Sequence, residues 1–353
     1  MSVYIINIIM IGIYSLLYNL INKKNWYKNN KKLKMIFVFL VTIQLFLILA
    51  LRKSSVGVDI RGYVRQFIFV RHASLDEILL LRHEIGYKLL VKLISFLTGN
   101  PQMFLAIISG ISIIPIGRLI YKYSRMPFLS FALYISFNFY AFVFSGLRQA
   151  IAISIICISY DYIREQKPLK FILTVIIASL FHKSAMFFLP AYIIAKIKLN
   201  KKSLMTLLLG NMIIYIFRIE IMGFITTYVF DSFDIIESNS YTWFLFNLFI
   251  YILCLVFYKS TIERNYKSNE LYLLVAIGIS LMLFATVSNN AMRIANYYHI
   301  FIILLIPEVI YSIKDKKMVL LGLYILLLGN ITLSFWQLYT DGYKIVPYEF
   351  FWK

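Results

Sequence analysis

The stretch NKKNWYKNNKKLK, residues 22–34, decides how this chain folds, because it holds six lysines and no acidic residue. One apolar run precedes it at 3–21, and another follows at 35–51. A helix crosses a bilayer with about 20 apolar residues, and short basic loops stay on the cytoplasmic side. We therefore expect two spans joined by a cytoplasmic loop. Run 3–21 lacks a charged leader and a small-residue cleavage site, so we interpret it as a retained span.

The alternation of apolar runs and basic clusters continues to the C-terminus. Further apolar runs lie at 101–120, 127–147, 149–163, 171–182, 186–197, 204–219, 241–258, 271–287, 294–313 and 318–339. Basic clusters lie near 118–125, 164–170, 196–202, 259–267 and 314–317. All of them are cytoplasmic only if residues 171–197 cross twice and residues 83–99 do not cross. We expect an all-α, polytopic integral membrane helical bundle of about 12 spans, a single domain over residues 1–353 with both termini outside.

The composition agrees with a membrane protein. Of the 353 residues 61% are hydrophobic, which is more apolar surface than a soluble domain can bury. The net charge is +20, but the lysines flank apolar runs, so we expect a lipid bilayer as partner and no nucleic acid. Cys157 and Cys254 lie inside apolar runs, which argues against a metal cluster and against a disulfide.

Residues 83–101, HEIGYKLLVKLISFLTGNP, have the pattern of an amphipathic helix. Apolar residues recur at helical spacing, at Ile85, Leu89, Leu90, Leu93, Phe96 and Leu97. Lys88 and Lys92 lie on another face. We expect a helix near 84–98 that lies in the outer membrane interface. An ordinary span is the alternative, and the two lysines argue against it.

The outer ends of the expected spans carry few charges, and these are of mixed sign. After the second span, Gly57 and Gly62 bracket Asp59 and Arg61 and permit a tight turn against a ligand or a helix. Glu84 opens the interfacial helix, where the helix dipole favours a carboxylate. A capping role explains Glu84 as well as a catalytic role does.

In FSGLRQAIAIS, residues 144–154, Arg148 and Gln149 begin a span. The positive end of a helix dipole, with its free N–H groups, suits phosphate oxygens. The alternative is a snorkelling arginine at a span end. Such arginines usually have basic neighbours and Arg148 has none, so we favour a ligand.

Two further outer junctions hold polar residues. His182 lies between two apolar runs, although a lone histidine is most often a hydrogen-bonded packing residue. Arg293, Asn296 and Tyr297 are spaced to share one helix face, and His299 lies off that face. Charges near hydrocarbon are costly without a partner or a ligand, so several on one face of the membrane indicate a site.

The residue types at these junctions predict the class of ligand. Arginines with neutral amides and a helix N-terminus suit a diphosphate. Asp59, Glu84 and His182 are candidates for a general base. An apolar bundle suits a lipid tail, so we expect a lipid-diphosphate sugar donor at the outer leaflet.

Short motifs follow one another along nearly the whole chain. They are D-x-R-x-Y from Asp59, E-x-G-Y-x-L from Glu84, G-L-R-Q-A-I-A from Gly146, H-x-S-A from His182, an arginine near a tyrosine (Arg293, Tyr297), and I-V-P-Y from Ile345. In this order they resemble the EpsG family of exopolysaccharide and capsule polymerases, related in role to the Wzy polymerases. That family usually has an acidic, aromatic loop after D-x-R, whereas the loop here is basic, with Arg65 and Arg71.

The resemblance implies a helical glycosyltransferase in the bacterial plasma (inner) membrane, with its site on the extracytoplasmic side. It would join oligosaccharide repeat units carried on undecaprenyl diphosphate, using one as donor and one as acceptor. It would use no metal or other cofactor. A flippase and a chain-length regulator would be its protein partners.

Roles follow from the resemblance and the residue types. Arg148 and Arg293 are assigned to the diphosphate, with Arg61 as a weaker third. The expected base is His182, then Glu84, then Asp59. The other candidates for substrate binding are Gln149, Asn296, Tyr297 and Tyr63.

Three other functions share parts of this pattern. A flippase or transporter for lipid-linked glycans would show internal repeats and ionisable groups near mid-membrane. No repeat is evident, and Glu308, beside Pro307, is the one candidate deep in a span. A ligase would share the donor site, and a non-catalytic synthase subunit is the third alternative.

Overall fold

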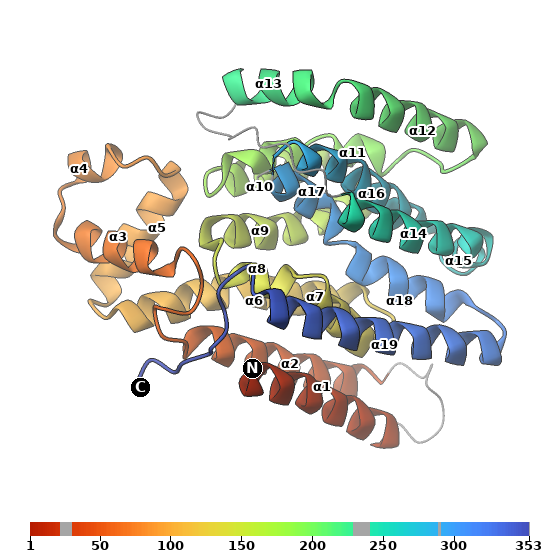
Figure 1. Cartoon of the computed structure of the whole chain (residues 1–353), viewed down its shortest axis with the longest axis horizontal. Coiled ribbons are helices and arrows are strands. Elements are labelled where there is room, and N and C mark those ends of the chain that lie inside the picture. The colour runs from red at the N-terminus through yellow and green to blue at the C-terminus, as the bar shows by residue number, and fades with distance from the viewer. Residues whose placement is uncertain (22–29, 229–240, 289–290, 353) are drawn as a thin grey trace.

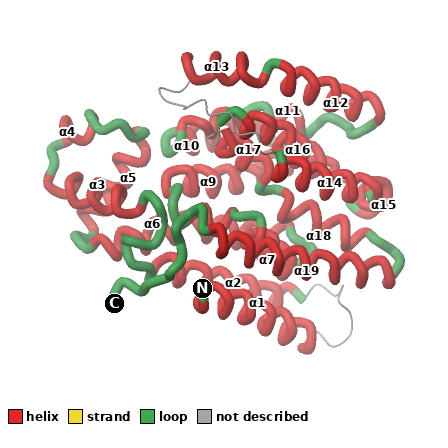
Figure 2. The backbone as a smooth tube through the Cα atoms, viewed as in Figure 1, coloured by secondary structure: helices red, strands yellow, loops and turns green. Residues whose placement is uncertain are grey.

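The computed structural model describes residues 1–21, 30–228, 241–288 and 291–352, and within these ranges it confirms an all-helical chain. No strand occurs there, and an isolated β-bridge joins Arg52 to Phe350. Figures 1 and 2 show a bundle of long helices with a small lobe at one end. The lobe consists of α3 (Ile60–His72), α4 (Leu75–Leu79) and α5 (Ile85–Leu97). We call this end of the bundle the lobe end.

The rest of the chain forms the bundle. Its first half consists of α1 (Ser2–Ile21), α2 (Lys31–Ala50), α6 (Pro101–Tyr123), α7 (Pro127–Ser136), α8 (Phe139–Val143), α9 (Leu147–Arg164), α10 (Pro168–Ser179), the 3-10 helix η1 (Lys183–Phe188) and α11 (Ala191–Ile194). The second half consists of α12 (Lys201–Ile216), α13 (Arg218–Tyr228), α14 (Thr242–Val256), α15 (Tyr258–Arg264), η2 (Tyr266–Ser268), α16 (Asn269–Leu281), η3 (Met282–Thr286), α17 (Met292–His299), α18 (Ile302–Ser312) and α19 (Lys316–Thr340). The two termini lie on the same side of the bundle, since the Tyr4 hydroxyl donates to the Ile345 carbonyl at 2.8 Å.

The described residues contain six helices long and apolar enough to cross a membrane, or up to eight if each of two bent pairs is one span. The expected count of about 12 is not confirmed. Several apolar runs form shorter pieces instead. Run 127–147 is divided into α7 and α8 at Asn138, which has a left-handed backbone (φ 66°). Runs 171–182 and 186–197 form the short helices α10, η1 and α11, each below the length of a full span.

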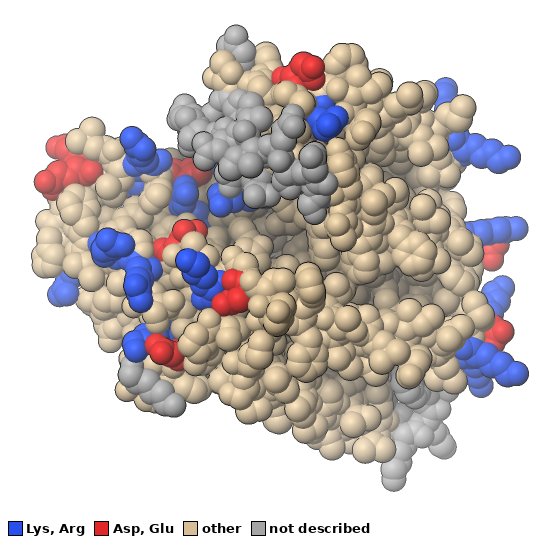
Figure 3. Space-filling view, in the orientation of Figure 1, with Lys and Arg blue, Asp and Glu red and all other residues tan. Residues whose placement is uncertain are grey.

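Charged side chains gather at the two ends of the bundle. Figure 3 shows blue and red groups over the lobe and along the opposite edge, with a broad uncharged band between them. At the end opposite the lobe, basic residues of different helices lie together. Ion pairs such as Arg118–Asp161 and Arg164–Glu270 join these helices. This separation is the one that the sequence pattern predicts. A bilayer around the band is favourable because hydrocarbon excludes charge.

Helix α5 coincides with the helix expected near 84–98 and is not among the candidate spans. Its lysines do not face water as the amphipathic pattern indicates. Lys88 Nζ donates to the Leu79 carbonyl at 2.7 Å, and Lys92 Nζ donates to the carbonyls of Val70 and Ala73. The lysines therefore bind carbonyls at the ends of α3 and α4. The opposite, apolar face is left exposed, at Leu89, Leu93, Phe96 and Leu97.

Candidate functional site

Four segments that are distant in the sequence meet at the lobe end. They are the start of α5, the start of α9, the turn between α10 and η1, and α17, which contacts both η1 and α9. These segments carry Glu84, Arg148, His182 and Arg293. The structure thus brings together residues that the sequence singled out one by one.

A glycine sets the distance between α5 and the turn after α10. The backbone N–H of Gly86 donates to the Leu180 carbonyl at 2.8 Å, and a Cβ at Gly86 would lie 2.7 Å from Leu180 atoms. Any side chain there would push α5 away from the turn. Gly86 therefore lets Glu84 approach the segment that carries His182.

Glu84 contacts two parts of the site at once. Its Oε2 forms an ion pair with Nη1 of Arg148, and its Oε1 accepts a hydrogen bond from the backbone N–H of Lys183 at 3.2 Å. The side chains of Glu84 and Arg148 are 11% and 21% exposed, so water screens this pair only in part. The Glu84 carboxylate makes no capping hydrogen bond to α5. The pairing with Arg148, rather than helix capping, therefore explains its position.

Electrostatics keep Glu84 ionised. Burial by itself would raise the pKa of this carboxyl group, but the Arg148 guanidinium and the N–H groups of Glu84 and Lys183 outweigh burial and lower the pKa below its usual value. The second edge of Arg148 is close to Tyr63, whose hydroxyl lies 3.5 Å from Nε. Arg148 is thus held by two side chains, and no described residue hydrogen-bonds to its Nη2.

His182 belongs to a small hydrogen-bonded triangle. Its Nδ1 lies 2.6 Å from Ser184 Oγ and 3.4 Å from the Tyr297 hydroxyl, and Ser184 Oγ lies 3.1 Å from that hydroxyl. Ser184 and Tyr297 are buried, so the triangle fixes the orientation of the ring. No described residue hydrogen-bonds to Nε2. This nitrogen is therefore available to a ligand.

The imidazole of His182 is neutral at neutral pH. Burial lowers its pKa to about 4; Glu84 opposes the shift, while the positive charges of Arg148 and Arg293 add to it. Arg293 lies at the start of α17, which contacts both η1 and α9, and its positive charge acts on His182. A neutral imidazole near guanidinium groups can accept a proton while those groups bind an anion.

Helices α9 and α17 are joined beside this triangle. The Gln149 side-chain amide donates from Nε2 to the Arg293 carbonyl at 2.6 Å, and Gln149 is buried. This contact sets the position of Arg293. A direct role of Gln149 in substrate binding stays a prediction, as does that of Asn296, which is half-buried on α17.

An open groove of about 910 Å³ adjoins the site inside the lobe. It is lined by Val58, Asp59, Arg61, Gly62, Tyr63, Arg65, Gln66, Phe69, Leu81, Arg82, His83 and Arg148. Asp59, Arg61 and Tyr63 therefore lie on the groove wall, and Arg148 lies between the groove and His182. The expected turn is made by Gly57 alone, which has a positive φ of 111°, whereas Gly62 lies within α3.

Sequence reasoning missed several residues here. Ser184 stood in the H-x-S-A motif without a role, and its spacing of two from His182 was the available signal. His83 and Arg82 precede Glu84 and were not singled out, although both line the groove. No group of His, Cys, Asp or Glu suited to hold a metal ion occurs among the described residues.

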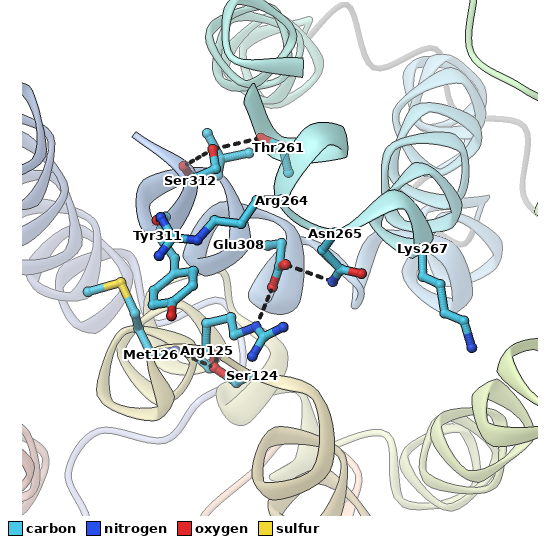
Figure 4. Close-up of polar contacts among 12 residues, drawn as sticks. Ser124, Arg125, Met126, Thr261, Arg264, Asn265, Lys267, Glu308, Tyr311 and Ser312 are labelled. Atoms are coloured by element: carbon cyan, nitrogen blue, oxygen red, sulfur yellow. Dashed lines mark hydrogen bonds and ion pairs between the residues drawn. The ribbon is translucent and has the colours of Figure 1, made fainter. Parts of the chain in front are cut away.

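Glu308, the candidate for a transporter-like group, lies at the end opposite the lobe. Its Oε1 accepts a hydrogen bond from Asn265 at 2.7 Å, and its Oε2 lies 3.5 Å from Nε of Arg125 (Figure 4). Both carboxylate oxygens are therefore paired locally.

Comparison with known proteins gives one family. The model of the EpsG family matches residues 35–350, which is nearly the whole chain. No curated protein and no solved structure matches.

Proposed function

Because the chain belongs to the EpsG family, we propose that it polymerises oligosaccharide repeat units carried on undecaprenyl diphosphate, for a capsule or an exopolysaccharide. The family match and the apolar helices fit a polysaccharide polymerase. The observation that carries the proposal is the joining of the segments that hold Arg148, His182 and Arg293. Glu84 pairs with Arg148 and accepts a hydrogen bond from the N–H beside His182, and the neighbour of Arg148, Gln149, binds the Arg293 carbonyl.

The diphosphate of the donor binds between Arg148 and Arg293. Arg148 lies in the first turn of α9, where backbone N–H groups and the helix dipole also favour an anion. Glu84 holds Nη1 of its guanidinium and the Tyr63 hydroxyl lies 3.5 Å from Nε, which leaves Nη2 for phosphate oxygens. The role of these groups is to stabilise the charge that develops on the leaving diphosphate.

His182 acts as the general base. The acceptor hydroxyl loses its proton to Nε2 while its oxygen attacks the anomeric carbon. The bond from that carbon to the diphosphate oxygen breaks, and the electron pair leaves with the diphosphate. For this role the ring proton must be on Nδ1. The Nδ1–H then donates a hydrogen bond to Ser184 Oγ, and the Ser184 hydroxyl donates one to the Tyr297 hydroxyl. Glu84 is already bound by two donors and ranks below His182.

The site faces the extracytoplasmic side of the bacterial plasma membrane. Support comes from the basic clusters at the opposite end, which the positive-inside rule places in the cytoplasm. Single cysteines introduced at exposed Arg82 and exposed Lys317 test this placement in intact cells. The native Cys157 and Cys254 are buried and give little background. A membrane-impermeant maleimide should label position 82 alone, and labelling of position 317 alone would reverse the orientation.

Purified protein in lipid with lipid-linked repeat units tests the activity. A ladder of chain lengths identifies a polymerase. Single transfer to another acceptor would identify a ligase. No reaction would favour a flippase or a synthase subunit, provided that a thermal unfolding measurement shows the protein to be folded.

A further inference from the structure

The groove holds more positive charge than a donor diphosphate needs. Arg61, Arg65 and Arg82 line it in addition to Arg148, and Asp59 is the one carboxylate among its lining residues. The structure gives no ion pair between Arg61, Arg65 or Arg82 and any described carboxylate. Figure 3 shows blue groups gathered over the lobe.

The arginines come from two different segments that line the groove. Arg61 and Arg65 lie one turn apart on α3, on the face that also carries Gln66 and Phe69. Arg82 comes from the loop between α4 and α5. Gly62 adds no bulk, since a Cβ there would have no atom within 4 Å. The groove is therefore open beside Gly62, next to Arg61.

A second observation concerns the polar lining of the groove. Gln66 lines the groove, and its amide atoms Oε1 and Nε2 are buried and have no hydrogen-bond partner among the described residues. An unsatisfied buried amide is unfavourable. Rotation of this side chain into the groove would let hydroxyl groups of a bound sugar satisfy it. The aromatic rings of Tyr63 and Phe69 offer apolar surface for the sugar rings.

We propose that this groove binds the acceptor glycan, and that the glycan carries an anionic group, a sugar carboxylate or a sugar phosphate, which Arg61, Arg65 and Arg82 recognise. The identification of the bound glycan as the acceptor rests on the proposed polymerase function. A volume of about 910 Å³ accommodates several sugar residues rather than one small anion. The position of Arg148 at the boundary connects this groove with the donor site, as transfer between two bound substrates requires.

Binding measured without turnover tests the inference. Full-length protein in lipid nanodiscs is titrated with three tetrasaccharides of equal length: one with uronic acids, its carboxyl-reduced neutral counterpart, and one with sugar phosphates. Undecaprenyl diphosphate is the fourth probe. The test variant is Arg61→Gln with Arg65→Gln. The matched control is Arg71→Gln, an exposed arginine of the same helix that contacts Gly99 and does not line the groove.

We expect an acidic probe to bind the wild type and the Arg71 variant, and to bind the double variant about tenfold or more weakly. Added salt should weaken this binding and leave that of the neutral probe unchanged. The acidic probe that binds more tightly shows whether the recognised anion is a carboxylate or a phosphate. Equal binding of acidic and neutral probes would overturn the inference. So would a double variant that binds the acidic probes normally, or one that loses undecaprenyl diphosphate instead.

The two proposals fail separately. If length ladders form but the wild type binds no acidic probe, the polymerase stands and the anionic acceptor does not. If an acidic probe binds through Arg61 and Arg65 but no ladder forms, the groove is a glycan site in a protein of another function. Thermal unfolding of the double variant, in which both replaced side chains are exposed, checks that the fold is retained.

Discussion

The two ends of the bundle hold their charges differently. At the end opposite the lobe, the carboxylate of Asp161 meets Arg118 and Lys122, and that of Glu308 meets Arg125. Tyr123 and Asn265 donate further hydrogen bonds to these carboxylates. Both of these buried acids are surrounded by donors from other segments. Such clusters join helices and leave neither carboxylate free for a ligand.

The lobe end is different around His182. The described residues give one ion pair there, Glu84 with Arg148, while Arg293, Arg61 and Arg65 have no carboxylate partner. Uncompensated positive charge beside hydrocarbon is unfavourable unless an anion binds. The comparison therefore assigns structure to one end and ligand binding to the other. Substitutions at the lobe end should change activity, and substitutions at the opposite end should change stability.

The largest effect is expected for His182→Ala. Loss of a general base lowers kcat about a thousandfold, measured as the rate of ladder growth at saturating substrate. In the wild type, burial lowers the pKa of His182 to about 4. A base works while deprotonated, so kcat/KM should hold steady as pH falls from neutral and decline only near that pKa. A decline centred near the ordinary histidine value of about 6.5 would contradict the buried, neutral imidazole.

Arg148→Lys should lower polymerisation about a hundredfold, because a point charge cannot replace a two-edged guanidinium. Lysine keeps the charge and can still pair with Glu84, so the loss reports the geometry of the free edge. Arg118→Lys at the opposite end is the matched control and should give normal ladders, since Asp161 keeps Lys122. Normal ladders from the Arg148 variant would remove the diphosphate site from this end.

Part of the site at the lobe end could be predicted from the sequence. The positions of Arg148, His182 and Arg293 at span ends were readable from apolar runs, because charge placement in a membrane protein is set locally. Their assembly around one point was expected from their shared side, and in the structure the segments that carry them pack together. The partner of Arg148 was not predictable. Glu84 lies 64 residues away, and a carboxylate at a helix start has an equally good local explanation.

The expected span count is not confirmed, for a related reason. Hydropathy marks residues 127–147 as one apolar run, but the left-handed Asn138 divides it. Lys88 and Lys92 were expected to face water because periodicity gives their face of the helix but not the neighbour that covers it. The carbonyls that they bind belong to α3 and α4. Tertiary contacts of this kind leave no periodic signal in the sequence.

A smaller loss of activity is expected for Gly86→Ala. The added Cβ would meet Leu180 at 2.7 Å, so α5 must move and carry Glu84 away from Lys183 and Arg148. A displacement of this size should lower kcat about tenfold, and stability should fall as well because the clash is with backbone atoms of Leu180. Gly210→Ala, where a Cβ would meet no atom within 4 Å, is the control. Equal rates for the two variants would mean that the spacing of α5 and the turn is not important.

The smallest effect on activity, close to none, is expected for Glu308→Gln. The amide oxygen of glutamine can still accept the hydrogen bond from Asn265, and Arg125, whose side chain is 42% exposed, then meets water. Stability should fall by about 1 kcal/mol, because a half-exposed ion pair is worth little. Thermal unfolding and chain-length ladders measure both quantities on one preparation. A variant with full stability and no activity would show that Glu308 carries a proton or a ligand through the bundle. The end opposite the lobe would then hold a functional charge, as the lobe end does.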